Sequence, residues 1–287
     1  MRPHTYAYYP GCTLHSTAKE YDVSTRLVCG KLGIKLQELE DWTCCGASSA
    51  HSTSHLLSIA LPARELQAAE EMGSPLAVAC AMCFSRLKHT AYELTDKAKL
   101  GLVNELLGKE FHNATEVVHL LKVLYEASDA MPLRRPLKEL KVACYYGCLL
   151  VRPQEVVDFD DVENPQIMDR LIEKSGAEGI EWDFKTACCG ASLPLTRRDV
   201  VLKLSHRILS QAKQLGADCV AVACPMCQSN LDTYQKEMEA TYKDKLELPV
   251  LYFTQLVGLA LDFSPKQLLL DKHFTDPMPM LKDKGLA

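Results

Sequence analysis

Short apolar segments alternate with longer stretches of helical periodicity along the chain. Three segments of the first half are typical of β-strands, and they cover residues 6–9, 34–39 and 75–79. A helix is expected after the first strand, because Thr17 and Glu20 have the spacing of a capping box. A second helical stretch ends near Gly73, and Pro62 either kinks or restarts it.

The second half repeats this order of elements. Its expected strands cover residues 141–146, 180–184 and 219–223. Asn164 and Pro165 open one helix, and residues 196–215 form another that Gly216 closes. The two halves also end alike, with similar segments at residues 117–121 and 252–256. The chain after Ser264 is expected to be an irregular extension.

Alternating strands and helices predict an α/β fold of two pseudo-symmetric halves, each with a mostly parallel sheet. The join is placed at residues 130–138, where Pro132 and Pro136 flank two arginines. The expected domains are residues 1–130 and residues 131–287, and the second includes the C-terminal extension. A chain of 287 residues is long enough to bury a core in each half without disulfide bonds.

Ten of the 13 cysteines fall into two sets of five with one shared plan. Each set has a Gly-Cys, then a Cys-Cys-Gly-Ala doublet, then a Cys-x-x-Cys. The first set is Cys12, Cys44, Cys45, Cys80 and Cys83, and the second is Cys148, Cys188, Cys189, Cys224 and Cys227. The second doublet and the second Cys-x-x-Cys each lie 144 residues after the first (189 minus 45, and 224 minus 80). The other three, Cys29, Cys144 and Cys219, are interpreted as small hydrophobic residues.

Each repeated cysteine is expected in a connection from a strand to the following helix. The carboxyl ends of parallel strands meet at one edge of a sheet, where ligands bind in α/β folds. The helix N-termini at this edge direct free N–H groups and a positive dipole end toward the thiols, which favours thiolates. Five thiols per half are therefore expected to converge on one crevice, and the glycines beside them leave room for a bulky ligand.

Charge and composition exclude several classes of protein. The net charge is −5, from 32 basic and 37 acidic residues, which gives no general attraction to nucleic acid or to an anionic membrane. The N-terminus lacks a basic-then-apolar signal, and the nearly apolar segment 248–261 is too short to span a bilayer. We expect a soluble cytoplasmic protein. The odd number of cysteines and the two adjacent pairs argue against a disulfide framework.

Three chemistries remain for the ten cysteines. A thioredoxin-like dithiol explains each Cys-x-x-Cys but leaves six repeated cysteines without a role. Zinc needs only four ligands in a closed site, although one half could still hold it. An iron-sulfur cluster in each half uses the sets more fully, since a cubane takes four cysteines and a fifth could bridge irons. No ferredoxin-type run of cysteines and no glycine-rich dinucleotide motif occurs, so any flavin or nicotinamide is expected on another chain.

The cysteine pattern resembles the family with duplicated cysteine-rich CCG domains, and over nearly the whole chain it resembles the B subunit of CoB-CoM heterodisulfide reductases. The resemblance rests on the Gly-Ala after both doublets, the Tyr-Tyr before each Gly-Cys, and the longer loop 149–153 of the second half. It implies two non-cubane 4Fe-4S clusters, one held by each set of five cysteines. It also implies cleavage of the mixed disulfide of coenzyme M and coenzyme B, with electrons from a ferredoxin-like iron-sulfur subunit that is fed by a flavin subunit.

Two thiolate products need protons, and His51 and His55, just after the first doublet, are candidate donors. The substrate of the resembled family is anionic, which makes Arg152, Arg197 and Arg198 candidate substrate-binding residues. Solvent exposure is the competing interpretation for all five side chains.

Two other functions stay open. CCG proteins also serve as electron-transferring subunits beside other dehydrogenases and quinone-linked enzymes, and this chain could be one of them. A zinc-stabilised interaction module without catalysis is the third hypothesis.

Overall fold

The computed structural model describes residues 4–47 and 49–287, and these residues form two parallel four-stranded sheets with the same topology. The first sheet has the order β2-β1-β3-β4, and the second has the order β6-β5-β7-β8. The strands are β1 (Thr5–Tyr9), β2 (Lys35–Glu38), β3 (Leu76–Val78), β4 (Val117–His119), β5 (Lys141–Tyr145), β6 (Glu178–Gly179), β7 (Cys219–Val222) and β8 (Val250–Tyr252). The predicted α/β class with two pseudo-symmetric halves is confirmed.

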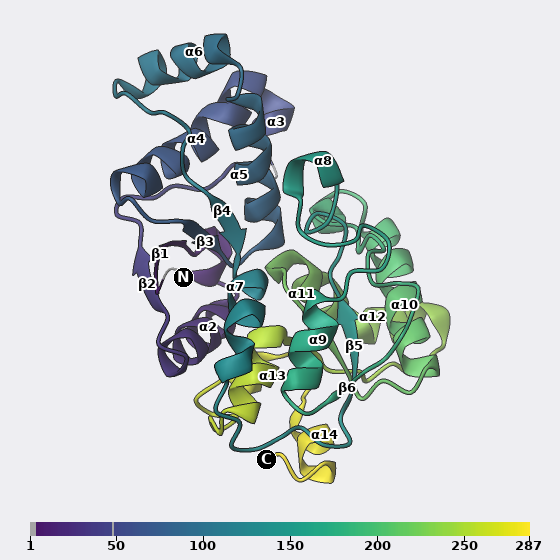
Figure 1. The fold of residues 1–287 in the computed structure, drawn as a ribbon. Coiled ribbons are helices and arrows are strands. Elements are labelled where there is room, and N and C mark those ends of the chain that lie inside the picture. Colours follow the sequence, from purple (N-terminus) through teal and green to yellow (C-terminus); the bar gives the residue numbers. More distant parts are fainter. Residues whose placement is uncertain (1–3, 48) are drawn as a thin grey trace.

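Helices connect and cover these strands (Figure 1). Those of the first half are α1 (Gly11–Leu14), α2 (Lys19–Lys31), α3 (Ala50–Thr53), α4 (His55–Glu71), α5 (Ala81–Glu93), α6 (Lys97–Leu107) and α7 (Leu120–Ala127). Those of the second half are α8 (Gln154–Val157), α9 (Ile167–Lys174), α10 (Arg198–Gln214), α11 (Pro225–Asp232), α12 (Gln235–Tyr242), α13 (Phe253–Ala260) and α14 (Met278–Asp283). The three 3-10 turns are η1 (Ser128–Ala130), η2 (Leu193–Leu195) and η3 (Leu270–Lys272).

Three local predictions differ from the structure. The strand expected at residues 180–184 is wrong, because the strand formed in this region is β6, at residues 178–179. Trp182 instead packs into the core, where its Nε1 donates to the Cys144 carbonyl. The capping box at Thr17 is wrong, since α2 begins after Ala18 without a side-chain cap. Helix α4 runs through Pro62, so the helix does not restart at this residue.

The C-terminal extension is more regular than expected. It contains η3 and α14, and Leu281 and Leu286 are buried in the core. Arg135 in the connection between the halves donates to the Leu286 carbonyl at 3.1 Å. The extension therefore packs against the connection near the expected boundary after residue 130.

Each half packs a helix on the other half. Helix α13 of the second half packs on α2 of the first, and α7 of the first half packs on α9 of the second. In the first of these contacts, Tyr21 stacks on Tyr252 with ring centroids 4.1 Å apart, and the buried hydroxyls of Ser24 and Thr254 are 2.7 Å apart. Figure 1 shows α13 beside α2 and α7 beside α9 along this boundary. Burial in each half therefore depends on the other half.

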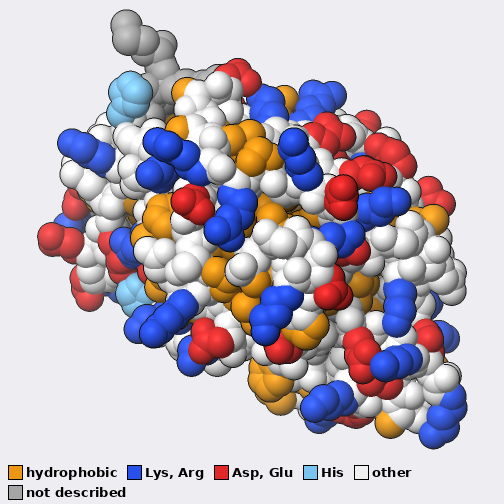
Figure 2. All heavy atoms as spheres, turned by 90° about the horizontal axis from the view of Figure 1, so that it is seen from below, with side chains coloured by type: hydrophobic (Ala, Val, Ile, Leu, Met, Phe, Trp, Pro, Cys, Tyr) orange, Lys and Arg blue, Asp and Glu red, His pale blue; other side chains and the backbone are white. Residues whose placement is uncertain are grey.

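The surface carries charges of both signs. On the lower face, Lys and Arg side chains are interspersed with Asp and Glu around hydrophobic patches (Figure 2). In the part of the chain that the structure describes, no helix has the length and apolar character needed to cross a membrane.

Candidate metal centre

All ten repeated cysteines lie at the carboxyl edge of the two sheets, as the alternation of elements predicts. In the first half, the Sγ atoms of Cys12 and Cys44 are 3.9 Å apart, and those of Cys45 and Cys83 are 3.3 Å apart. In the second half, Cys148 hydrogen-bonds Cys188, and the Sγ atoms of Cys189 and Cys227 are 3.6 Å apart. Each half thus gathers five thiols that the sequence spreads widely.

The two sets of thiols meet across the boundary between the halves. Cys80 shares a hydrogen bond with Cys224, and this bond raises the pKa of the Cys80 thiol. Cys224 in turn receives hydrogen bonds from Cys227 and from Cys80, which hold its pKa well below the ordinary value. Both residues are the N-caps of the helices that follow them, α5 and α11. Two helix N-termini therefore point at the place where the two sets touch.

A tyrosine at the end of the first strand fixes the doublet in each half. Tyr9 donates to the carbonyl of Thr43 at 2.7 Å, and Tyr145 donates to the carbonyl of Ala187 at 2.5 Å. Each carbonyl belongs to the residue directly before a doublet. The same hydrogen bond thus sets the position of Cys44 in one half and of its counterpart in the other.

Gly11 and Gly147 leave space for the thiols in equivalent places. Both have positive φ, +73° and +68°. A Cβ atom at Gly11 would lie 3.1 Å from the Sγ of Cys83, and one at Gly147 would lie 3.1 Å from the Sγ of Cys227. A side chain at either position would be strained and would crowd a sulfur atom.

The halves support their doublet loops with different side chains. In the first half, the fully buried Glu65 accepts hydrogen bonds from the N–H and the hydroxyl of Thr43, at 2.8 and 2.9 Å. In the second half, Asn230 on α11 donates to the carbonyls of Cys189 and Ala191, at 3.3 and 2.9 Å. Its Nδ2 is also 3.6 Å from the Sγ of Cys189.

Each set has a buried side and an outer side. Cys12, Cys44 and Cys188 are exposed and Cys148 is half-buried, whereas the other six repeated cysteines are buried. A hydrogen bond from Cys148 and the Gly190 N–H lower the pKa of Cys188 to about 6, although partial burial opposes this. The two sets thus touch in the interior, and each reaches solvent through its Gly-Cys residue and the first cysteine of its doublet.

The three remaining cysteines lie in the hydrophobic core. Cys29, Cys144 and Cys219 are at most 1% exposed. Burial raises the pKa of Cys29 to about 12, and it raises the pKa of the other two thiols as well. These thiols stay protonated and unreactive near neutral pH.

The donor set fits an iron-sulfur cluster. Each site gathers five free thiols, and each has a glycine where a Cβ would meet a cysteine sulfur. Among the described side chains, no group of three His, Cys, Asp or Glu residues is arranged to hold one metal ion.

The candidate proton donors and arginines lie in ordinary surface contacts. His51 belongs to α3, and its side chain lies outside the described residues. The His55 side chain is 72% exposed, and its Nε2 is 3.6 Å from the Glu93 carboxylate. Arg152 donates to the Glu163 carboxylate, the Thr186 hydroxyl and the Val162 carbonyl. The other two arginines form ion pairs, Arg197 with Asp199 and Arg198 with Glu237. None of these contacts involves a repeated cysteine.

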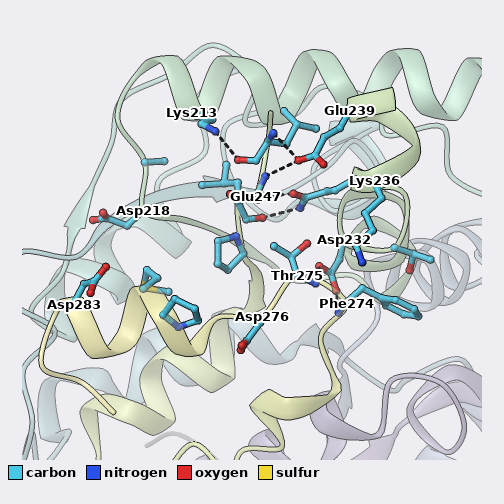
Figure 3. Close-up of a pocket in the computed structure, with 18 of the residues that line it drawn as sticks. Lys213, Asp218, Asp232, Lys236, Glu239, Glu247, Phe274, Thr275, Asp276 and Asp283 are labelled. Atoms are coloured by element: carbon cyan, nitrogen blue, oxygen red, sulfur yellow. Dashed lines mark hydrogen bonds between the residues drawn. The ribbon is translucent and has the colours of Figure 1, made fainter. Parts of the chain in front are cut away.

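A pocket of about 710 Å³ lies elsewhere in the second half (Figure 3). Asp218 and Pro249, which line it, directly precede β7 and β8, so the pocket lies at the opposite edge of the sheet from the cysteines. Asp218 pairs with Lys284 at 2.8 Å, and Lys213 donates to the Leu246 carbonyl at 2.8 Å. The pocket is therefore separate from the thiol sites.

Several residues around the thiols are not evident from the sequence patterns. The two Tyr-Tyr pairs stand out in the sequence, but only the structure shows that Tyr9 and Tyr145 are the equivalent members. Asn230 and Glu65 carry no sequence signal beyond their polarity on helices that otherwise pack in the core.

Comparison with known proteins identifies the class. A model of the cysteine-rich domain family, CCG, matches residues 6–88 and 142–232, and the chain belongs to this family. One relative is the 8-methylmenaquinol:fumarate reductase membrane anchor subunit of Wolinella succinogenes, 34% identical, with the match covering 94% of this chain and 97% of that protein.

Another relative is the B subunit of the ferredoxin:CoB-CoM heterodisulfide reductase of Methanosarcina mazei, 30% identical over 92% of this chain and 91% of that protein. The fold is shared with a hypothetical protein from Helicobacter pylori, with a TM-score of 0.78 and 18% identity, over 96% of this chain and 53% of that one. The predicted resemblance is thereby confirmed. These relatives are named as subunits of a fumarate reductase and of a heterodisulfide reductase.

Proposed function

We propose that this chain is the subunit of a multisubunit oxidoreductase that cleaves a mixed disulfide at two iron-sulfur clusters. The observation that carries the proposal is the contact between Cys80 and Cys224, which joins two equivalent five-thiol sites inside the protein. Cleavage of a disulfide takes two electrons and two protons and yields two thiols. Two adjacent one-electron centres match that requirement, and the B subunits of heterodisulfide reductases are among the relatives.

The ten cysteines would hold the clusters, five to each, as 4Fe-4S clusters of the non-cubane type. The first site belongs to the domain of residues 1–130 and the second to the domain of residues 131–287. Bound clusters would supply one electron each to the disulfide. Tyr9 and Tyr145 hold the doublets in place, and Gly11 and Gly147 keep the space beside the sulfur atoms open.

Electrons would come from an iron-sulfur partner protein, which a flavin protein of the same complex would reduce. Support for a place in such a complex comes from relatives named as the D subunits of dihydromethanophenazine:CoB-CoM heterodisulfide reductases. The substrate would be a small anionic disulfide, with Arg152, Arg197 and Arg198 as candidate contacts after they exchange their present partners.

The test is the iron and acid-labile sulfide content of anaerobically purified protein, together with EPR spectra with and without thiols. About eight irons per chain are expected for two 4Fe-4S clusters. A paramagnetic signal that changes when a substrate thiol is added under oxidising conditions supports the proposal. Zinc in place of iron would contradict it, and so would signals that ignore every thiol and disulfide tested.

A second function is electron transfer in a quinol-linked complex. It is favoured by the 34% identity with the 8-methylmenaquinol:fumarate reductase subunit, which the match covers almost completely. Here the clusters would pass electrons between a quinol and another subunit. A menaquinol analogue that reduces the clusters, with no response to thiols, would select this function over the first.

A further inference from the structure

Two buried polar atoms without partners lie beside the contact between the thiol sets. In the described part of the chain, the His119 Nε2 and the Tyr252 hydroxyl are among the buried side-chain atoms without a hydrogen-bond partner. Both side chains are completely buried. A buried donor that gives up water without gaining a partner is costly, so each such group calls for an explanation.

His119 and Tyr252 occupy equivalent places in the two halves. His119 ends β4 and lies in register with Val78 of β3, and Tyr252 ends β8 and lies in register with Val222 of β7. Each valine is two residues before the first cysteine of a Cys-x-x-Cys. The two polar side chains therefore flank Cys80 and Cys224 on adjacent strands.

The hydrogen bonds of His119 fix where its proton lies. Its Nδ1 accepts from the Leu121 N–H at 3.1 Å, so the neutral ring carries its proton on Nε2. Burial lowers the pKa of His119 to about 4, although weak hydrogen bonds toward the carbonyls of Ala79 and Ala223 oppose this, and the ring is therefore neutral at pH 7. Neither contact has the geometry of a full hydrogen bond, so Nε2 still lacks a partner. Ala79 and Ala223 directly precede Cys80 and Cys224. The Nε2–H group of His119 therefore lies close to both cysteines.

Tyr252 presents its hydroxyl to the same region from the second half. Burial raises the pKa of Tyr252, and the negative charges of Glu20, Tyr21, Cys224 and Cys80 raise it further. The phenol therefore stays protonated and can only be used as a neutral O–H group near neutral pH.

Each ring is held in place by an aromatic side chain of the opposite half. Tyr21 of the first half stacks on Tyr252 at an interplanar angle of 7°. Phe159 of the second half packs edge-on against His119, with ring centroids 5.9 Å apart. These apolar contacts fix the orientation of the rings without satisfying their polar atoms.

We propose that the Nε2–H of His119 and the O–H of Tyr252 donate hydrogen bonds to sulfur atoms of the two clusters where the sites meet. This inference rests on the iron-sulfur sites of the proposed function and assigns two cluster-contacting residues to them. Hydrogen bonds to sulfur stabilise the reduced, more negative cluster and so raise its reduction potential. Their loss should lower the potential without removing iron.

The decisive variant is Tyr252→Phe, which keeps the stacked ring and removes only the hydroxyl. The experiment measures iron content, the midpoint potentials by EPR-monitored titration, and hyperfine coupling to exchangeable protons after transfer to D2O. The expected result is full iron content, a more negative potential for one cluster and the loss of one exchangeable-proton coupling. The His119→Asn variant keeps an acceptor for the Leu121 N–H while removing Nε2–H, and we expect it to act in the same direction.

Tyr242→Phe is the matched control, because Tyr242 is a partly exposed tyrosine at the end of α12. It should leave potentials and couplings unchanged. Tyr252→Phe and His119→Asn proteins with full iron content but parental potentials and couplings would overturn this inference and leave the proposed function standing. Parent protein without iron would overturn both.

Discussion

The two halves place the same five cysteines at the same strand ends but hold the doublets by different means. The first half uses a carboxylate, Glu65, to accept from Thr43, whereas the second uses an amide, Asn230, to donate to backbone carbonyls. The tyrosine contact is common to both halves. The positions of the thiols are therefore the shared feature, while the surrounding support differs between the halves.

The largest effect is expected from removing one buried doublet thiol in either half. We expect Cys45→Ser and Cys189→Ser each to lower the iron content by about half, because each removes a ligand from one site only. Iron analysis and EPR of the two variants check this, and each should keep the signal that the other loses. Loss of all iron in either variant would show that the thiols form one shared centre.

The supports of the doublet loops should differ in strength. Glu65→Ala leaves the N–H and hydroxyl of Thr43 without a buried partner and should cost about 2–4 kcal/mol of stability. Asn230→Ala should cost about 1–3 kcal/mol, since carbonyls tolerate the loss of a donor better. Urea unfolding of both variants gives the comparison, with Glu65→Gln as the control that keeps an acceptor. Equal losses in the two alanine variants would remove this distinction between the halves.

The boundary between the halves can be weakened at a single hydroxyl. Thr254→Val removes the hydrogen bond to Ser24 across the α2 and α13 contact while keeping the side-chain volume, and it should cost about 1 kcal/mol. Thermal unfolding measures the change. Thr254→Ser keeps the hydroxyl and should lose less, and a serine variant as unstable as the valine variant would assign the effect to packing.

The smallest effect is expected from the pH dependence of one carboxylate of the first half, Glu38. Hydrogen bonds from Trp42 and Arg26 hold the pKa of Glu38 below its ordinary value, although partial burial opposes them. A depressed pKa stabilises the fold above the unfolded-state pKa, and this stability disappears as the pH falls below about 4.5 through the folded-state value. Trp182, the tryptophan that precedes the second doublet, donates instead to the Cys144 carbonyl, which does not titrate.

Glu38→Gln should therefore reduce stability by about 0.5–1 kcal/mol at pH 7 and by less near pH 4. Urea unfolding of the variant and the parent protein at both pH values checks the prediction. A gap that stays constant with pH would show that the Glu38 charge contributes nothing.

Local patterns were enough to predict much of this protein. Strand and helix alternation follows from the spacing of apolar residues, and it predicted the parallel sheets and the convergence of the cysteines at one edge. The pattern of residues 180–184 led to the wrong prediction of a strand, because Trp182 is buried by packing in the core and not by strand pairing. The sequence pattern specifies which faces are apolar, but it does not specify the partner that covers them.

The sequence alone predicted two equivalent sets of five thiols on an α/β framework, because strand-to-helix turns and their glycines are local features. Three arrangements needed the folded molecule: α7 and α13 each pack on a helix of the other half, Cys80 meets Cys224, and His119 and Tyr252 lie beside that contact. These arrangements join residues far apart in the chain. They arise because helices of one half pack on helices of the other.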